Sequence, residues 1–168
     1  DRILSVTDAL GGVTSSSYDL VGNLLRETDA NGKETIYTYT DRDKLLTVTD
    51  PGGYVTTYNY DSAENLISVT DGNGHVNSYT YDSLNRNNAE TNALDQTTSY
   101  SYDGSGNLTE VTDPLGHTTF NTYDALNRLI NTRDALNNET ITEYDEVGNK
   151  LSFSDSNGHT TIFTYDGR

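Results

Sequence analysis

Hydrophobic and polar residues alternate in short stretches along this chain, and a turn signal interrupts the alternation about every ten residues. Stretches such as LLTVT at 45–49 and TTYNY at 56–60 are rich in β-branched and aromatic residues, which predicts β-strands. Turn sequences such as DPGG at 50–53 separate them, because Asp, Pro and Gly each favour a tight reversal. No apolar stripe of helical period survives such frequent turns. The pattern therefore predicts an all-β fold.

The alternation repeats every 21 residues without an insertion or a deletion. We number each repeat from its tyrosine, which is position 1. Residues 1–168 then form one array of eight 21-residue repeats, with partial repeats at both ends, in which each repeat contacts only its neighbours. We expect the tyrosine at position 1, the aspartate at position 12 and the glycine at position 15 to define the repeat structurally. These residues include Tyr18, Tyr39, Tyr60, Tyr81, Tyr102, Tyr123, Tyr144, Tyr165, Asp29, Asp50, Asp71, Asp113, Gly32, Gly53, Gly74, Gly116 and Gly158.

Each repeat carries two turn signals. Position 15 holds only Gly, Asp or Asn, and position 5 holds the same three residue types with Glu64 as the exception. These residues tolerate a positive φ better than others do, so we expect a positive φ at both positions. Two turns per repeat leave room for about two strands per repeat.

Two architectures fit two strands and two turns in 21 residues. One is a repetitive antiparallel β-hairpin array, and the other is a parallel β-helix with one repeat per coil. In a β-helix the equivalent aspartates would stack about 4.8 Å apart as ladders of like charge, whereas in a hairpin array they lie about 9.6 Å apart. We therefore favour the hairpin array, with residues near position 9 of a repeat opposite residues near position 19.

Positions 18, 20 and the following position 1 lie on one face of a strand, because successive side chains alternate between faces. Thr56, Tyr58 and Tyr60 are one such set. We expect the tyrosine rings to pack in rows across the strands, with their hydroxyl groups in water. The alternative is that the rows form platforms on which sugar rings stack.

Composition narrows the choice of partners. The 168 residues include ten basic and 26 acidic ones, which gives a net charge of −16. That charge repels phosphate groups, so nucleic acid and anionic lipid are poor partners, and no apolar run is long enough for membrane insertion. The chain lacks cysteine, which excludes disulfides, and it lacks methionine, which suggests an excerpt of a longer protein.

Candidate chemistry is sparse. His75, His117 and His159 all occupy position 16 of every second repeat, about 19 Å apart in a hairpin array, which is too far to share a metal ion. The acidic turns lack the spaced ligands of a dedicated calcium loop, so they favour at most incidental Ca²⁺ binding. Sequence motifs for a catalytic serine, cysteine or phosphate loop are missing. We therefore expect no catalytic residue, no metal site and no cofactor other than loosely held Ca²⁺, and hence no enzyme.

The repeats YDGSGNLTEVTDPLGHTT at 102–119 and YDLVGNLLRETDANGKET at 18–35 resemble the YD repeat of the Rhs family. This family includes Rhs polymorphic toxins, insecticidal toxin-complex C components, wall-associated proteins and teneurins. The resemblance covers the whole chain and implies a spiralling β-sheet that closes into a hollow shell, which in bacterial members encloses a toxic C-terminal domain. The arginine that usually follows glycine in the family follows asparagine here, at Arg86 and Arg128.

The resemblance implies a structural role for the array in an extracellular, secreted or surface protein, most typically a bacterial one. The first hypothesis is part of a β-sheet shell that encapsulates a cargo or toxin polypeptide. The alternative is an extracellular adhesion module or a self-assembling filament that binds carbohydrate or cell surfaces. Expected partners are adjoining repeats or other copies at the sheet edges, an enclosed C-terminal toxin or glycans.

Overall fold

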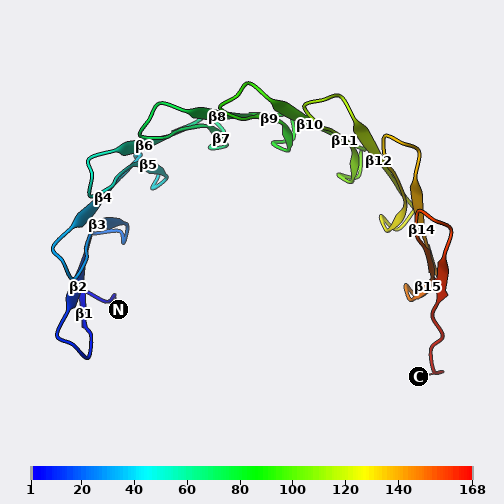
Figure 1. The fold of residues 1–168 in the computed structure, drawn as a ribbon, viewed down its shortest axis with the longest axis horizontal. Helices are drawn as coiled ribbons and strands as arrows, with labels where there is room; N and C mark the ends of the chain where they lie inside the picture. Colours follow the sequence, from blue (N-terminus) through cyan, green and yellow to red (C-terminus); the bar gives the residue numbers. More distant parts are fainter. Residues whose placement is uncertain (1, 168) are drawn as a thin grey trace. The chain divides into compact units, whose positions relative to one another are not determined.

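The computed structural model describes residues 2–167, and all regular elements in that range are β-strands (Figure 1). A complete repeat contributes one strand from positions 7–11 and one strand from position 17 to the next tyrosine, and the first and last strands are shorter. The strands are β1 Ser5–Thr7, β2 Val13–Tyr18, β3 Leu24–Thr28, β4 Glu34–Tyr39, β5 Leu45–Thr49, β6 Val55–Tyr60, β7 Leu66–Thr70, β8 Val76–Tyr81, β9 Asn87–Thr91, β10 Thr97–Tyr102, β11 Leu108–Thr112, β12 Thr118–Tyr123, β13 Leu129–Arg133, β14 Glu139–Tyr144, β15 Lys150–Ser154 and β16 Thr160–Ile162.

The sixteen strands follow one another in the sheet in chain order, and the pairs described are antiparallel. Thr47 at position 9 lies opposite Thr57 at position 19, and Arg26 lies opposite Ile36 in the same way. The predicted all-β hairpin array and its register are therefore confirmed. The parallel β-helix is wrong, since each strand pairs with its neighbour in the chain. The chain forms two compact units, Asp1–Thr80 and Tyr81–Arg168, which we call the N-terminal and C-terminal units.

Both turns of the repeat have the same backbone geometry. The N–H at position 15 donates to the carbonyl at position 12, and the N–H at position 12 donates to the carbonyl at position 16. Positions 5, 2 and 6 repeat this arrangement, as Gly106, Asp103 and Asn107 show. This is the three-residue hairpin loop in which a type I turn is followed by one left-handed residue.

The left-handed residue of each loop is at position 5 or 15, as the turn signals predict. All the positive φ values of the described residues fall at these two positions, and six of them belong to residues other than glycine. Glu64, the exception in the sequence pattern, also has a φ of 68°. The backbone therefore imposes this conformation even where the residue type resists it.

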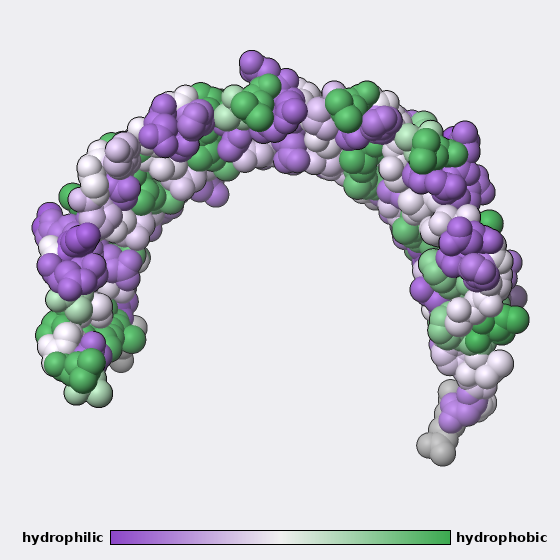
Figure 2. All heavy atoms as spheres, viewed as in Figure 1, coloured by the Kyte–Doolittle hydropathy of each residue, from purple (hydrophilic) through white to green (hydrophobic). Residues whose placement is uncertain are grey.

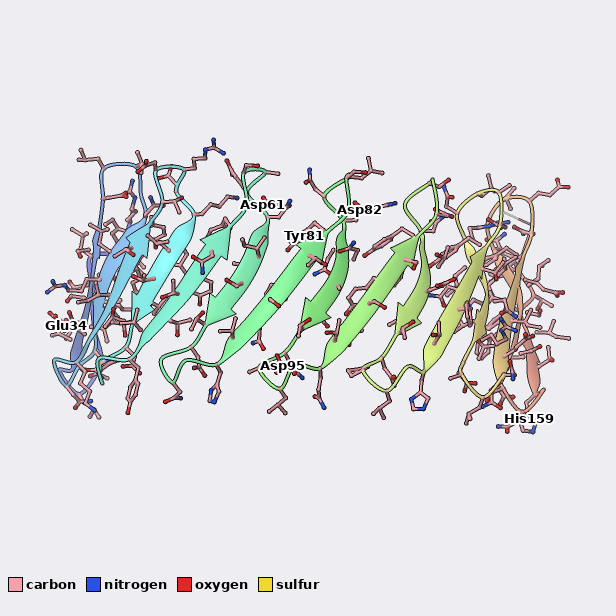
Figure 3. The ribbon with its side chains drawn as sticks, turned by 90° about the horizontal axis from the view of Figure 1, so that it is seen from above. Glu34, Asp61, Tyr81, Asp82, Asp95 and His159 are labelled. Atoms are coloured by element: carbon pink, nitrogen blue, oxygen red, sulfur yellow. The ribbon has the colours of Figure 1, made fainter. Side chains whose placement is uncertain are left out.

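The turns form two rows, one at each end of the strands. We call each row an edge, and the word does not refer here to the outermost strands. The Tyr-Asp edge is formed by the turns at positions 2–6, and the Asp-Gly edge by the turns at positions 12–16. In the N-terminal unit Asp61 lies at the edge opposite Glu34, and in the C-terminal unit Asp82 lies at the edge opposite Asp95 and His159 (Figure 3). A bulge lies immediately before the position-1 tyrosine in strands such as β12. The step from Thr122 to Tyr123 on that strand matches two steps on the next strand, from Asn131 to Leu129.

The sheet is a single layer without a core. Among residues 2–167 no side chain is buried, and apolar side chains of the strands and turns remain at least partly exposed. Apolar and hydrophilic side chains are mixed and do not merge into one patch on the side that Figure 2 shows. Backbone pairing and contacts between adjacent strands therefore stabilise this sheet, rather than burial between two layers.

Candidate interaction surfaces

At least six of the position-1 tyrosines close the open end of their hairpin. Strands β9 and β10 are joined by a turn at the Asp-Gly edge, and their register pairs extend from Thr97 and Thr91 to Ser99 and Ala89. Beyond these pairs the Tyr102 hydroxyl donates to the main-chain carbonyl 15 residues earlier, over 2.8 Å. The same bond, between 2.8 and 3.3 Å, joins Tyr18 to Ile3, Tyr39 to Leu24, Tyr60 to Leu45, Tyr123 to Leu108 and Tyr165 to Lys150.

The expectation that these hydroxyl groups stay in water is therefore wrong. The carbonyl at position 7 lies where the strands separate toward the Tyr-Asp edge, and a phenol is long enough to reach it. A backbone carbonyl needs a donor when it is shielded from water, which gives a reason for tyrosine rather than phenylalanine here. The rings are half-buried, except for the more exposed Tyr165.

A second row of aromatic residues follows position 20 on the same face. The Tyr100 hydroxyl donates to Glu90 over 2.7 Å, and the hydroxyl of Tyr37 lies 3.5 Å from Glu27. The hydrogen bond to the Glu90 carboxylate, together with burial, raises the pKa of Tyr100 to about 12. The polar ends of these tyrosines are engaged within the sheet, which leaves them fewer free donors for a sugar.

At the Asp-Gly edge each aspartate is bonded within its own loop. The Asp113 carboxylate accepts hydrogen bonds from the N–H groups of Leu115 and His117, and its second oxygen lies 2.9 Å from His117 Nδ1. These bonds, the His117 side-chain bond first, lower the pKa of the Asp113 carboxyl. Asp71 with His75 and Asp155 with His159 repeat this geometry. Each of the three histidines thus lies within hydrogen-bond distance of the aspartate in its own turn.

Metal-binding geometry is not found at these turns. Within residues 2–167 no three histidine, aspartate or glutamate side chains come together in a way that would hold a metal ion. The same range contains no helix that could cross a membrane. Leucines project from the loop tips of the Asp-Gly edge instead: Leu94, Leu115 and Leu136 are 77%, 80% and 81% exposed.

The Tyr-Asp edge differs because its side chains reach the next repeat. Arg128 Nε lies 2.7 Å from the Asp124 carboxylate, and Arg128 Nη1 donates to the Asp145 carbonyl over 2.9 Å. The guanidinium group also stacks 4.7 Å from the centre of the Tyr144 ring. Arg86 makes the same contacts. The sequence interpretation missed position 6 as a contact residue, although Arg or Lys alternates there with Asn in successive repeats.

Comparison with known proteins agrees with this geometry. The family model described as RHS Repeat matches residues 1–34, 18–47, 39–76 and 89–119, which together make up more than half of the chain. No curated protein matches the chain.

Among solved structures, the crystal structure of TcdB2-TccC3-Cdc42 is 21% identical over 93% of this chain and 10% of that chain, with a TM-score of 0.73. TcdB2-TccC3 without its hypervariable C-terminal region is 21% identical over 93% of this chain and 10% of that chain, with a TM-score of 0.71. A Tc holotoxin pore structure from Photorhabdus luminescens is 21% identical over 89% of this chain and 9% of that chain, with a TM-score of 0.70.

The structural matches establish a shared fold, and this chain spans about a tenth of the length of those proteins. The sequence match, the strict 21-residue period and the two-strand repeat all indicate the same family. The chain belongs to the Rhs repeat family.

Proposed function

We propose that this chain forms part of the wall of a β-sheet shell that encloses a cargo polypeptide, in an extracellular bacterial protein of the toxin-complex type. The observation that carries the proposal is the single-layer sheet, in which no described side chain is buried. A continuous sheet of this kind separates two spaces, and strand side chains such as Leu25 and Ile67 stay partly exposed. The similarity in fold to TcdB2-TccC3 supports the same role.

The proposed role is structural and not catalytic. A wall of this kind requires no cofactor, and any Ca²⁺ at the acidic turns would act as a counterion. The net charge of −16 makes nucleic acid an unfavourable partner. The alternative of a carbohydrate-binding adhesion module or filament has less support, because tyrosine hydroxyls such as those of Tyr100 and Tyr102 are bonded within the sheet.

Limited proteolysis of the natural full-length protein that contains this array tests the shell. We expect the polypeptide that follows the array to resist protease, and to be cut rapidly once denaturant opens the sheet. The same polypeptide expressed without the array is the matched control. Equal cleavage rates with and without the array would exclude enclosure. Binding to a glycan array by the intact sheet, in the same experiment series, would instead favour adhesion.

A further inference from the structure

We infer that the residue at position 6 of each repeat and the residue at position 5 of the next repeat form a matched pair that specifies which repeats can be neighbours. The inference concerns how the sheet is put together, and it holds whether or not the sheet encloses a cargo. It rests on contacts at the Tyr-Asp edge, where three chemically different pairs occupy the same place.

The first kind of pair is arginine with glycine. Arg128 reaches past Gly148 to the Asp145 carbonyl and the Tyr144 ring, 2.9 Å and 4.7 Å away. A β-carbon at Gly148 would lie 3.9 Å from Arg128 Nη1, so a longer side chain there would compete for the same space.

Two further arginines also precede a position-5 glycine, at different distances from it. Arg2 lies against Gly22, where a β-carbon would approach Nη2 to 3.0 Å. Arg86 precedes Gly106, where a β-carbon itself would meet nothing within 4 Å. Steric exclusion of a side chain is therefore strongest at Gly22, and a β-carbon alone is accommodated at Gly106.

The second kind of pair is asparagine with an asparagine or aspartate. Asn107 Nδ2 donates to the Asp103 carboxylate in its own repeat, over 2.9 Å, and to Asn127 Oδ1 in the next repeat, over 2.8 Å. Asn23 does the same with Asp19 and Asp43. An amide nitrogen has two hydrogens, so one group serves both acceptors. The acceptor in the next repeat must be a residue that tolerates a positive φ, which asparagine and aspartate do.

The third kind of pair is lysine with glutamate. Lys44 Nζ lies 3.4 Å from Glu64 Oε2, and Arg42 Nη1 lies 3.2 Å from Glu64 Oε1. Glutamate is an unfavourable residue for the left-handed backbone conformation, and Glu64 is the only one at position 5. The ion pairs with Lys44 and Arg42 favour glutamate at this position despite the backbone conformation.

The three kinds of pair explain why repeats differ at positions where the turn alone would accept any of several residues. Position 6 holds arginine or lysine in one repeat and asparagine in the next. The pairs therefore alternate with a period of 42 residues. A repeat with glycine at position 5 therefore fits after an arginine repeat, but gives no acceptor to an asparagine repeat. Each repeat thereby selects the neighbour on its C-terminal side.

A double-mutant cycle on the 168-residue chain tests this selection. We expect Arg128→Asn to lower the folded-to-unfolded ratio about fivefold, because asparagine opposite Gly148 finds no acceptor. Gly148→Asn should lower it by a similar factor, because the new side chain enters the path of Arg128. The double variant rebuilds the pair seen at Asn107 and Asn127, and should be at least about fivefold more stable than addition of the two single effects predicts. Urea titration gives the ratios, and the cycle cancels the backbone cost of replacing Gly148.

The matched control combines Arg128→Asn with Gly116→Asn. Gly116 also has a positive φ and no atom near its β-carbon position, but it lies at the other edge. Its effect should simply add to that of Arg128→Asn. If Arg128→Asn prevents folding, Gly148→Ala and Gly148→Asn with native arginine still test the pair through hydrogen exchange at the 145–148 turn. Additive effects in the Arg128 and Gly148 cycle, or unchanged exchange in both Gly148 variants, would overturn the inference.

Discussion

The two edges of the sheet are built from the same turn but use it differently. At the Asp-Gly edge the side chains of Asp113 and His117 are 43% and 61% exposed, and they bond only within their loop. At the Tyr-Asp edge the side chains of Asp124 and Arg128 are 21% and 24% exposed, and Arg128 continues to the next repeat. One backbone motif thus gives a self-contained loop at one edge and a connection between repeats at the other. The difference arises because the position-6 side chain reaches acceptors in the next repeat, whereas the position-16 side chain bonds the aspartate of its own loop.

The largest expected effect tests whether the Tyr-Asp edge connects repeats. Tyr102→Ala should cost about 2–3 kcal/mol, because it removes a half-buried ring, a hydrogen bond to the main chain and the stacking partner of Arg86. Tyr102→Phe should cost only about 1 kcal/mol, since the ring remains.

The control for that pair is an aromatic residue at the other edge. Tyr54 at position 16 is 58% exposed, so Tyr54→Ala should change stability by less than about 0.5 kcal/mol. Urea denaturation measures all three variants. Similar losses for Tyr54→Ala and Tyr102→Ala would mean that the two edges do not differ in this way.

The next effect tests the claim that the two turns share one backbone geometry. Gly106 at the Tyr-Asp edge and Gly116 at the Asp-Gly edge have φ values of 93° and 85°, and a β-carbon at either would meet nothing within 4 Å. Alanine at either position should therefore cost about 1–2 kcal/mol through backbone strain alone, because its single β-carbon meets no neighbouring atom. Gly104 lies in the same turn outside the left-handed region, so Gly104→Ala should be close to neutral. Unequal thermal midpoints for the Gly106 and Gly116 variants would show different turns.

A smaller effect concerns the turn carboxylates. Alanine at Asp124 or Asp113 removes the same two bonds to backbone N–H groups in each loop. Asp124→Ala should nevertheless reduce stability more, because Arg128 then loses the carboxylate that orients it toward Asp145. Hydrogen exchange should spread into the following repeat in Asp124→Ala and stay local in Asp113→Ala. Exchange confined to one loop in both variants contradicts the comparison.

The smallest effect is a change in acid sensitivity at the Asp-Gly edge. The pKa of Asp113 in the folded chain lies below its ordinary value of about 3.9, mainly because His117 donates to it. Its stabilising contribution is therefore present above the unfolded pKa of about 3.9 and is lost as the pH falls through the folded pKa.

Asparagine at this position should keep the turn without that dependence. Asn92 occupies position 12 naturally and accepts the corresponding N–H bonds at 2.9 and 3.1 Å. Asp113→Asn should therefore leave stability at pH 7 nearly unchanged and make the loss below pH 4 shallower. Identical stability curves between pH 5 and pH 2.5 for parent and variant would show that this carboxylate contributes nothing to acid sensitivity.

The sequence by itself determined the repeat, the strands and the positions of both turns. Strict periodicity at Tyr18 and its counterparts, and glycine or asparagine at fixed offsets, encode local conformation that each segment adopts for its own steric reasons. Antiparallel pairing also followed from local information, since two three-residue loops per repeat leave hairpins as the simple solution, and like charges oppose a β-helix.

Only the tertiary structure decided what the side chains contact across strands and between repeats. The Tyr102 hydroxyl donates to a carbonyl 15 residues earlier, where the strand pair opens, and the bulge beside this tyrosine shifts the register by one residue. Arg128 donates to the Asp145 carbonyl in the next repeat, beside Gly148, which lies 20 residues after it. Such contacts depend on distances between segments that no local pattern specifies. The contacts made by the alternating arginine and asparagine residues at position 6 could therefore be identified only in the folded sheet.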